Sequence, residues 1–155
     1  TLHRNFQGYC TREHTGQVYG FGASSISQLT KAYSQNAKEV NTYMHQIEKN
    51  GLATEKGISL NREEQICRYA IQSLMCNKYL DMNEVSALFQ ISTGTLYETL
   101  RFHPGLLDEM VIDNLVKRHD NVIEVTEMGQ FFIRNIAMVL DPHLDASEGR
   151  YSKTI

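Results

Sequence analysis

Apolar residues recur at helical spacing in several stretches of the chain. The first such stretch lies between residues 36 and 51, with apolar positions at Ala37, Val40, Tyr43, Met44 and Ile47. This 3.6-residue period predicts an amphipathic helix with one apolar stripe. Gly51 follows the stripe, and glycine favours the left-handed conformation in which many helices end, so we expect the helix to end there.

A second predicted helix carries two adjacent apolar rows. Asn61 and Glu64 have the spacing of a capping pair, in which each side chain accepts a hydrogen bond from the other residue's backbone N–H. The rows that follow are Ile66, Ala70 and Leu74, and Cys67, Ile71 and Met75. A face this wide predicts that the helix is central to its domain.

Shorter helices and a hairpin are predicted farther along. Helices are expected to start at Asp81, at Thr95 and at Pro104, which suits a first helical turn. Residues 116–125 indicate a hairpin that turns at His119-Asp120-Asn121. Thr126 should cap a helix over residues 127–140, with a buried row of Phe132, Ile136 and Leu140. Residues 61–155 therefore predict a mostly helical, winged-helix-like α+β domain.

The first 60 residues are predicted to form a separate unit. Residues 52–60 read as a hairpin or an extended crossing. Residues 18–27, VYGFGASSIS, indicate a strand that ends in small residues. Small residues let a ligand approach the backbone closely. Residues 4–9, RNFQGY, set a guanidinium, amides and aromatic rings beside a glycine. Together these two segments predict the border of a small-molecule site at the edge of a sheet.

Several segments resemble the oxygen-independent coproporphyrinogen III oxidases, radical S-adenosylmethionine enzymes of haem biosynthesis. The segments are RNFQGY, GFGASSIS, SLMCN, IRNIAM and the closing YSKTI. They occur in order over nearly the whole chain. RNFQGY is the most specific, because related haem chaperones are expected to carry a tryptophan soon after the tyrosine, and Cys10 and Thr11 stand here. Residues 12–17 depart from the family's acidic loop, so no contacts are transferred to them.

The resemblance implies that the chain is the C-terminal portion of such an enzyme. Residues 1–60 would be a remnant of the radical-SAM partial barrel, and residues 61–155 a winged-helix-like domain covering the substrate. The full-length enzyme would oxidatively decarboxylate coproporphyrinogen III to protoporphyrinogen IX, using a radical made from S-adenosylmethionine and electrons from a donor. Two S-adenosylmethionine molecules are implied. The 4Fe–4S cluster would be held by the N-terminal part, so the fragment alone is expected to be inactive.

Three positions are assigned to S-adenosylmethionine by the same resemblance: Phe6, Gln7 and Ile26. Phe6 would stack on adenine or face the sulfonium, the latter worth about 0.5–2 kcal/mol. Gln7 offers both a donor and an acceptor, and Ile26 would pack against the adenine. No catalytic residue and no metal ligand is expected within this chain. Arg62, Arg68 and Arg134 are candidates for the substrate's propionates, although each is individually more typical of a solvated or capping arginine.

Composition bears on the partners and on the alternatives. The 15 Lys+Arg and 18 Asp+Glu give a net charge of −3, which argues against a nucleic-acid partner. No apolar run approaches the roughly 20 residues of a membrane span. Three cysteines, an odd number, favour a reducing cytoplasm. Two alternatives remain open: a haem chaperone of the same superfamily, and a winged-helix DNA-binding module with Lys117, Arg118 and His119 on its hairpin.

Overall fold

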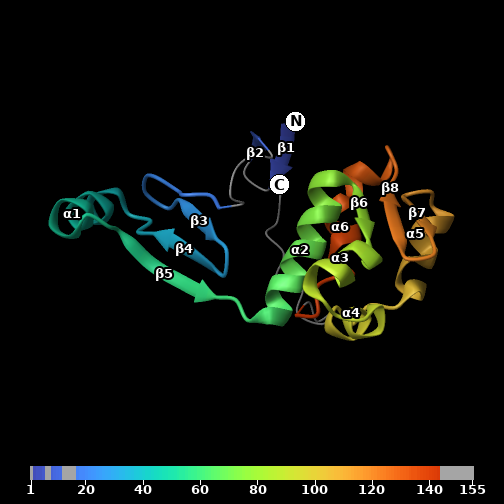
Figure 1. Cartoon of the computed structure of the whole chain (residues 1–155). Helices are drawn as coiled ribbons and strands as arrows, with labels where there is room; N and C mark the ends of the chain where they lie inside the picture. Colours follow the sequence, from blue (N-terminus) through green and yellow to red (C-terminus); the bar gives the residue numbers. More distant parts are fainter. Residues whose placement is uncertain (1, 6–7, 12–16, 144–155) are drawn as a thin grey trace. The chain divides into compact units, whose positions relative to one another are not determined.

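The structure, a computed structural model, describes residues 2–5, 8–11 and 17–143 (Figure 1). Contacts divide the chain into two compact units, one made mainly of residues up to Gln65 and the other of residues from Ile66 onward. Strands β1 (Leu2–Asn5) and β2 (Gly8–Thr11) pair as a two-stranded sheet. Together the described elements make a mixed helix-and-sheet protein, as the α+β prediction expected.

An antiparallel three-stranded sheet forms the centre of the first unit. Its strands are β3 (Ile26–Leu29), β4 (Ala32–Asn36) and β5 (Thr54–Ser59), in the order β3-β4-β5 (Figure 1). The segment predicted as a hairpin or an extended crossing is thus a strand, β5, paired with β4. The ladder shifts register between Gln35 and Asn36, so the end of β4 is irregular.

The strand predicted over residues 18–27 is largely wrong. Strand β3 begins only at Ile26, and Val18 makes a single isolated bridge to Gln28. Between them the backbone turns, with positive φ at Gly22 (99°) and at Ser24 (61°). Positive φ is incompatible with a strand, and glycine adopts it at low cost.

Asn36 explains why this segment folds as a loop. Its Nδ2 donates to the carbonyl oxygens of Gly20 and Gly22 at 3.3 and 3.1 Å, and to Ser25 Oγ at 3.1 Å. These bonds satisfy carbonyl groups that a strand would pair in a ladder. The loop also passes close to β3, because a Cβ on Gly20 would lie 2.8 Å from the Ile26 carbonyl oxygen. Only glycine fits there.

Helix α1 (Val40–Asn50) lies between β4 and β5 in the sequence. Glu39 caps it, accepting from the backbone N–H groups of Asn41 and Thr42, and these bonds lower the pKa of its carboxyl. Gly51 ends the helix at φ 71°, as the sequence predicts. None of the helix's residues is buried, so the apolar stripe found in the sequence stays largely exposed in this chain.

The second unit is mostly helical. In chain order its elements are α2 (Arg62–Asn77), β6 (Tyr79–Asp81), α3 (Met82–Phe89), α4 (Thr93–Thr99), η1 (Pro104–Leu107), α5 (Asp108–Ile112), β7 (Val116–His119), β8 (Val122–Val125), η2 (Gly129–Phe132) and α6 (Ile133–Met138). Strands β6, β8 and β7 form a small antiparallel sheet in that order. The predicted hairpin is therefore present, and β6 adds a strand that the sequence did not indicate.

Helix α2 is central to the second unit, as its wide apolar face predicts. Glu64 N–H donates to Asn61 Oδ1 at 2.9 Å, and Asn61 N–H donates to Glu64 Oε2 at 2.7 Å, so the predicted capping pair is confirmed. The buried core around the helix consists mainly of Ile66, Cys67, Ala70, Leu74, Leu80, Met82, Val85, Leu96, Leu100, Leu107, Val116, Ile123, Ile136 and Leu140.

The prediction of one continuous helix over residues 127–140 is wrong. The chain makes a 3-10 turn, η2, followed by the short helix α6. Ile136 and Leu140 are buried as expected, but Phe132 is 47% exposed and does not belong to the buried row. Gly129 packs closely against the Leu115 backbone, because a Cβ there would stand 1.9 Å from the Leu115 carbonyl oxygen.

Two smaller differences concern helix starts. The third predicted helix is capped by Ser92, whose Oγ accepts from the Thr95 N–H at 3.0 Å, so helix α4 begins before Thr95. The helix predicted from Pro104 divides into η1 and α5 and ends at Ile112. No helix within the described ranges is long and apolar enough to cross a bilayer.

Candidate functional site

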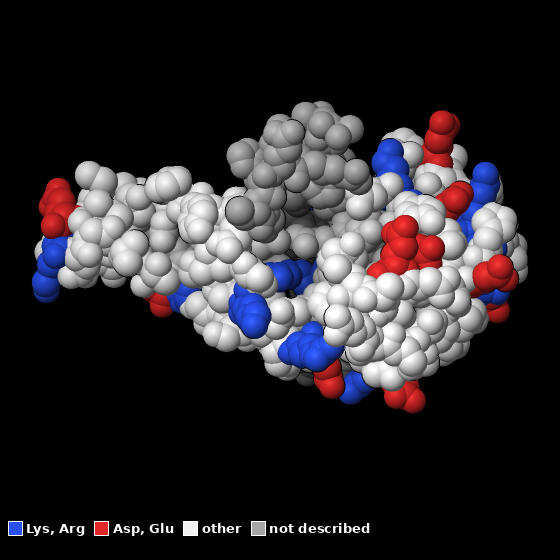
Figure 2. All heavy atoms as spheres, in the orientation of Figure 1, with Lys and Arg blue, Asp and Glu red and all other residues white. Residues whose placement is uncertain are grey.

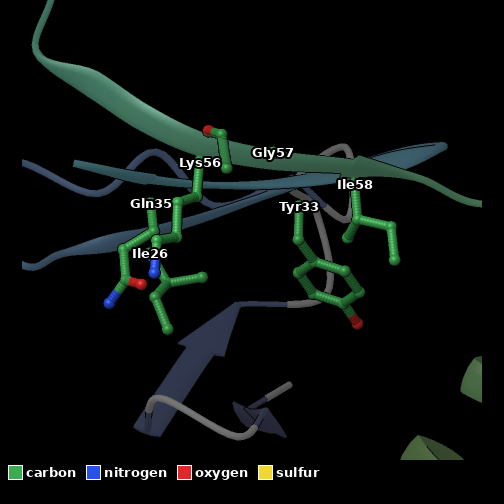
Figure 3. Close-up of a pocket in the computed structure, with 7 residues that line it drawn as sticks. Ile26, Tyr33, Gln35, Lys56, Gly57 and Ile58 are labelled. Atoms are coloured by element: carbon green, nitrogen blue, oxygen red, sulfur yellow. The ribbon is translucent and has the colours of Figure 1, made fainter.

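A shallow hollow lies on one face of the β3-β4-β5 sheet. Its volume is about 250 Å³. The residues that line it are Ile26, Tyr33, Ser34, Gln35, Lys56, Gly57 and Ile58. All of them belong to the three strands of one sheet, so the hollow depends on no contact with the second unit. Figure 3 shows five of these side chains, those of Ile26, Gln35, Lys56, Tyr33 and Ile58, projecting from the same side of the sheet.

Strand register explains why these side chains gather. Ile26 pairs with Gln35, and Gln35 pairs with Lys56, which makes one cross-strand row. Tyr33 pairs with Ile58 and makes the next row. Side chains alternate between the two faces of a strand, so residues two apart on β4 and on β5 share a face. The two rows therefore stand side by side, as Figure 3 shows.

The opposite face of the sheet carries small residues. There the register aligns Ser27 with Ser34, and Ser34 with Gly57. Ser27 Oγ accepts from the Gly20 N–H at 3.0 Å, so the glycine-containing loop adds a polar contact on this side. The bulky apolar and long polar side chains thus lie on the face that bears the hollow.

The hollow combines apolar surface with a single cation. Ile26 is 45% exposed and Ile58 is 55% exposed, which is unusual for two isoleucines on neighbouring parts of one face. The amide of Gln35 is held in place by donating to the Ser24 carbonyl oxygen at 3.1 Å. The Lys56 side chain is exposed and reaches across the same row. This arrangement suits a flat, partly apolar molecule that carries an anionic group.

Of the predicted cofactor-binding residues, the structure places Ile26 in the hollow. Phe6 and Gln7 lie outside the described residues. The assignment of the three positions to S-adenosylmethionine therefore stays a prediction. Sequence reasoning missed Tyr33, Gln35, Lys56 and Ile58. Their alternation along β4 and β5 is a signal, but it places them beside Ile26 only once the strand register is known.

The basic residues of the hairpin are partly engaged within the second unit. Arg118 Nη1 forms an ion pair with Asp108 Oδ1 at 3.0 Å and also donates to the Pro104 carbonyl. This contact ties β7 to the start of α5. On the face shown in Figure 2, acidic and basic side chains are interspersed over the second unit and form no broad basic field. Both observations weaken the DNA-binding alternative, since such modules present a concentrated basic surface.

The residues that the structure describes include His, Cys, Asp and Glu, the side chains that most often bind metal ions. Within those ranges no three or more His, Cys, Asp or Glu side chains stand together as metal ligands require. Cys67 is buried and Cys76 is partly buried, and neither forms a disulfide bond within the described residues.

Comparison with known proteins identifies the relatives of the chain. No protein-family model matches it. In structure it is similar to coproporphyrinogen III oxidase (HemN) from Escherichia coli, which is described as a radical SAM enzyme, with a TM-score of 0.77 and 37% sequence identity. The similarity covers 92% of this chain and 32% of that one. The fold of this chain is thus similar to that of part of the Escherichia coli enzyme.

The relatives found by sequence share one name. The chain is 39% identical over 144 residues to the oxygen-independent coproporphyrinogen III oxidase of Salmonella typhimurium. The aligned region covers 92% of the chain and 30% of that protein. It is 33% identical over 156 residues to that of Pseudomonas aeruginosa, covering 100% of the chain and 33% of that protein. The chain is a homologue of the C-terminal part of the oxygen-independent coproporphyrinogen III oxidases, which confirms the resemblance seen in the sequence. It spans about a third of the length of these relatives.

Proposed function

We propose that this chain acts as the C-terminal portion of an enzyme that oxidatively decarboxylates coproporphyrinogen III to protoporphyrinogen IX without oxygen. The observation that carries the proposal is the match to oxidases of this name over 92% of the chain at 39% identity. The fold agreement with the Escherichia coli enzyme supports it independently. The chain would serve haem biosynthesis in the cytoplasm, with an electron donor as a further partner.

The first unit would contribute to binding S-adenosylmethionine. Ile26 lies on an exposed sheet face, where an apolar side chain is available to pack against a flat ring. Phe6 and Gln7, which lie outside the described residues, are proposed to offer the same cofactor an aromatic face and an amide. The residues present fit the group in chemical character, and we assign this site to the second of the two S-adenosylmethionine molecules. That cofactor, when bound, supplies radical chemistry, whereas these residues bind and orient it.

The iron–sulfur cluster would be held by the N-terminal part of the full-length enzyme, as the family resemblance implies. The 155-residue chain alone should therefore be inactive. Purified by itself, it should show neither decarboxylation nor the visible absorption of an iron–sulfur cluster. The appearance of either signal in the isolated chain would contradict this part of the proposal.

The second unit would be a winged-helix-like domain that covers the substrate, with residues 1–60 as the remnant of the barrel and residues 61–155 as this domain. Its order of elements supports the likeness to a winged helix: a helix and a strand, then three α-helices with a 3-10 helix before the last of them, then a hairpin. A winged-helix shape does not imply DNA binding. The ion pair of Arg118 with Asp108 gives this hairpin residue a structural role within the domain.

One experiment separates the proposed enzyme from a haem chaperone. The full-length protein that carries this segment is reduced anaerobically and supplied with S-adenosylmethionine and coproporphyrinogen III, and vinyl-bearing products are separated by chromatography. We expect product formation and no stoichiometric haem binding. Haem binding without a vinyl product would establish the chaperone instead. Salt-dependent retention on duplex DNA would favour the regulatory module.

A further inference from the structure

The cross-strand row Ile26–Gln35–Lys56 points to a specific role for Lys56. We propose that the Lys56 ammonium binds a propionate carboxylate of the tetrapyrrole substrate, while the attached pyrrole ring lies on the apolar surface made by Tyr33 and Ile58, and Ile26 stays available to the cofactor. This inference rests on the proposed function. It adds a substrate-binding residue to a segment for which the sequence indicated only cofactor contacts.

Charge supports a carboxylate as the group bound. Lys56 is the single cation among the residues that line the hollow, and no carboxylate lines it. Glu55, the nearest acid along β5, is the unpaired residue at the register shift, and it is not among the residues that line the hollow. Within the described part of the chain, the Lys56 ammonium has no carboxylate within ion-pair distance. A ligand carboxylate would provide the missing counter-charge.

The apolar surface of Tyr33 and Ile58 suits an apolar ring beside that carboxylate. Ile58 leaves about half of its surface exposed, and the Tyr33 ring lies beside it on the same face (Figure 3). Ligand sites commonly combine such apolar walls with few polar groups that fix orientation. A volume of about 250 Å³ lies below the roughly 300–1,000 Å³ typical of sites that enclose a whole ligand. The hollow therefore suits one ring and its side chain, not an entire macrocycle.

The sign of the charge favours the substrate over the cofactor. S-adenosylmethionine carries a sulfonium and an ammonium against one carboxylate, so its net charge is positive. The Lys56 ammonium therefore attracts a tetrapyrrole bearing several propionates more strongly than it attracts this cofactor. Lysine acts as a point charge on a flexible stem, which suits a propionate whose position is set mainly by its ring.

Kinetics of the full-length protein test the proposal. Lys56→Gln should raise the KM for coproporphyrinogen III about tenfold and leave the KM for S-adenosylmethionine unchanged, because only the carboxylate contact is lost. Lys56→Arg keeps the charge and should stay within about twofold of the unsubstituted enzyme. Lys38→Gln is the matched control, since Lys38 is an exposed lysine of the same unit outside the hollow. It should change neither KM.

Other results would contradict the role of Lys56 or the proposed function. A rise in the KM for S-adenosylmethionine, or equal KM values in Lys56→Gln and the unsubstituted enzyme, would overturn the role of Lys56 while the proposed function stands. If the unsubstituted protein shows no turnover, the proposed function itself fails. A fluorescence titration with coproporphyrin III, the stable oxidised tetrapyrrole, then decides the inference, because binding must weaken about tenfold in Lys56→Gln. If Lys56→Gln does not fold, Lys56→Met tests the same loss of charge.

Discussion

Tyr97 Oη donates a hydrogen bond of 2.7 Å to Asn121 Oδ1, which joins helix α4 to the turn between β7 and β8. Asn121 also donates from Nδ2 to Asn83 Oδ1 at 3.0 Å, and its carbonyl accepts from the Met82 N–H at 2.9 Å. One asparagine thus connects the hairpin to both α3 and α4. In the sequence it stands out only as a turn residue.

Removing the phenol hydroxyl tests the contribution of this connection. Tyr97→Phe should lower the free energy of unfolding of the second unit by about 1 kcal/mol, because the hydrogen bond is lost while the ring and its edge contact with Phe102 remain. Urea denaturation measures the difference. The control is Tyr33→Phe, which changes a tyrosine of the first unit. It should leave the unfolding midpoint of the second unit unchanged. An unchanged midpoint in Tyr97→Phe would show that the hydrogen bond adds nothing to stability.

The same tyrosine predicts a loss of stability at alkaline pH. Burial raises the pKa of Tyr97 above its ordinary 10.0, and the Arg118 cation opposes the rise only in part. Above about pH 10 the unfolded phenol loses its proton while the folded one keeps it. The folded state then binds more protons, so its stability falls as the pH rises.

Thermal melting between pH 9 and 11 checks this dependence. The decline should be shallower in Tyr97→Phe, which has no titrating hydroxyl at this position. Burial also raises the pKa of Tyr79, with Asp81 as a further cause, so Tyr79→Phe belongs in the comparison. Tyr79 lies at the surface, where solvent screens its interactions, and its substitution should alter the slope less. Equal slopes in Tyr97→Phe and the unsubstituted chain would rule out the coupling.

Ser86 offers a stabilising substitution. Its side chain is buried in helix α3, and its Oγ has no hydrogen-bond partner among the described residues. An unsatisfied buried hydroxyl costs about 1–3 kcal/mol, and alanine is also the better helix former. Ser86→Ala should therefore raise the free energy of unfolding by about 1 kcal/mol. Ser73→Ala is the matched control, because Ser73 Oγ donates to the Tyr79 carbonyl and its loss should not stabilise.

Sequence alone predicts the elements that local rules determine. The capping pair Asn61 and Glu64 and the helix end at Gly51 both depend on residues within one turn, and both are confirmed. The turn of the β7–β8 hairpin likewise follows from its own residues. In each case the physical cause lies inside the segment, so no distant contact can override it.

The failures come from contacts between segments distant in sequence. The stretch from Gly20 to Ser25 looked like a strand, but the amide of Asn36 holds its carbonyl groups in a loop. Lys56 could not be linked to Ile26 before the register of β4 and β5 was known. Among the residues that line the hollow, the sequence singles out only Ile26, through the family resemblance. The rest of the hollow depends on strand pairing, which a periodicity does not specify.

Gly129 is the position at which one added methyl group should do the most damage. A Cβ there would meet the Leu115 carbonyl oxygen at 1.9 Å, which no side-chain rotation relieves because the neighbour is backbone. Gly129→Ala should lower the free energy of unfolding of the second unit by at least about 3 kcal/mol, by forcing η2 away from the strand β7 that follows Leu115. Gly94→Ala is the control. Gly94 lies in helix α4, and a Cβ there would lie 3.7 Å from Ser92 Oγ. That variant should leave the free energy of unfolding unchanged or raise it by up to about 1 kcal/mol. Urea denaturation of both variants compares them directly, and equal effects would show that the close approach at Gly129 can relax at little cost.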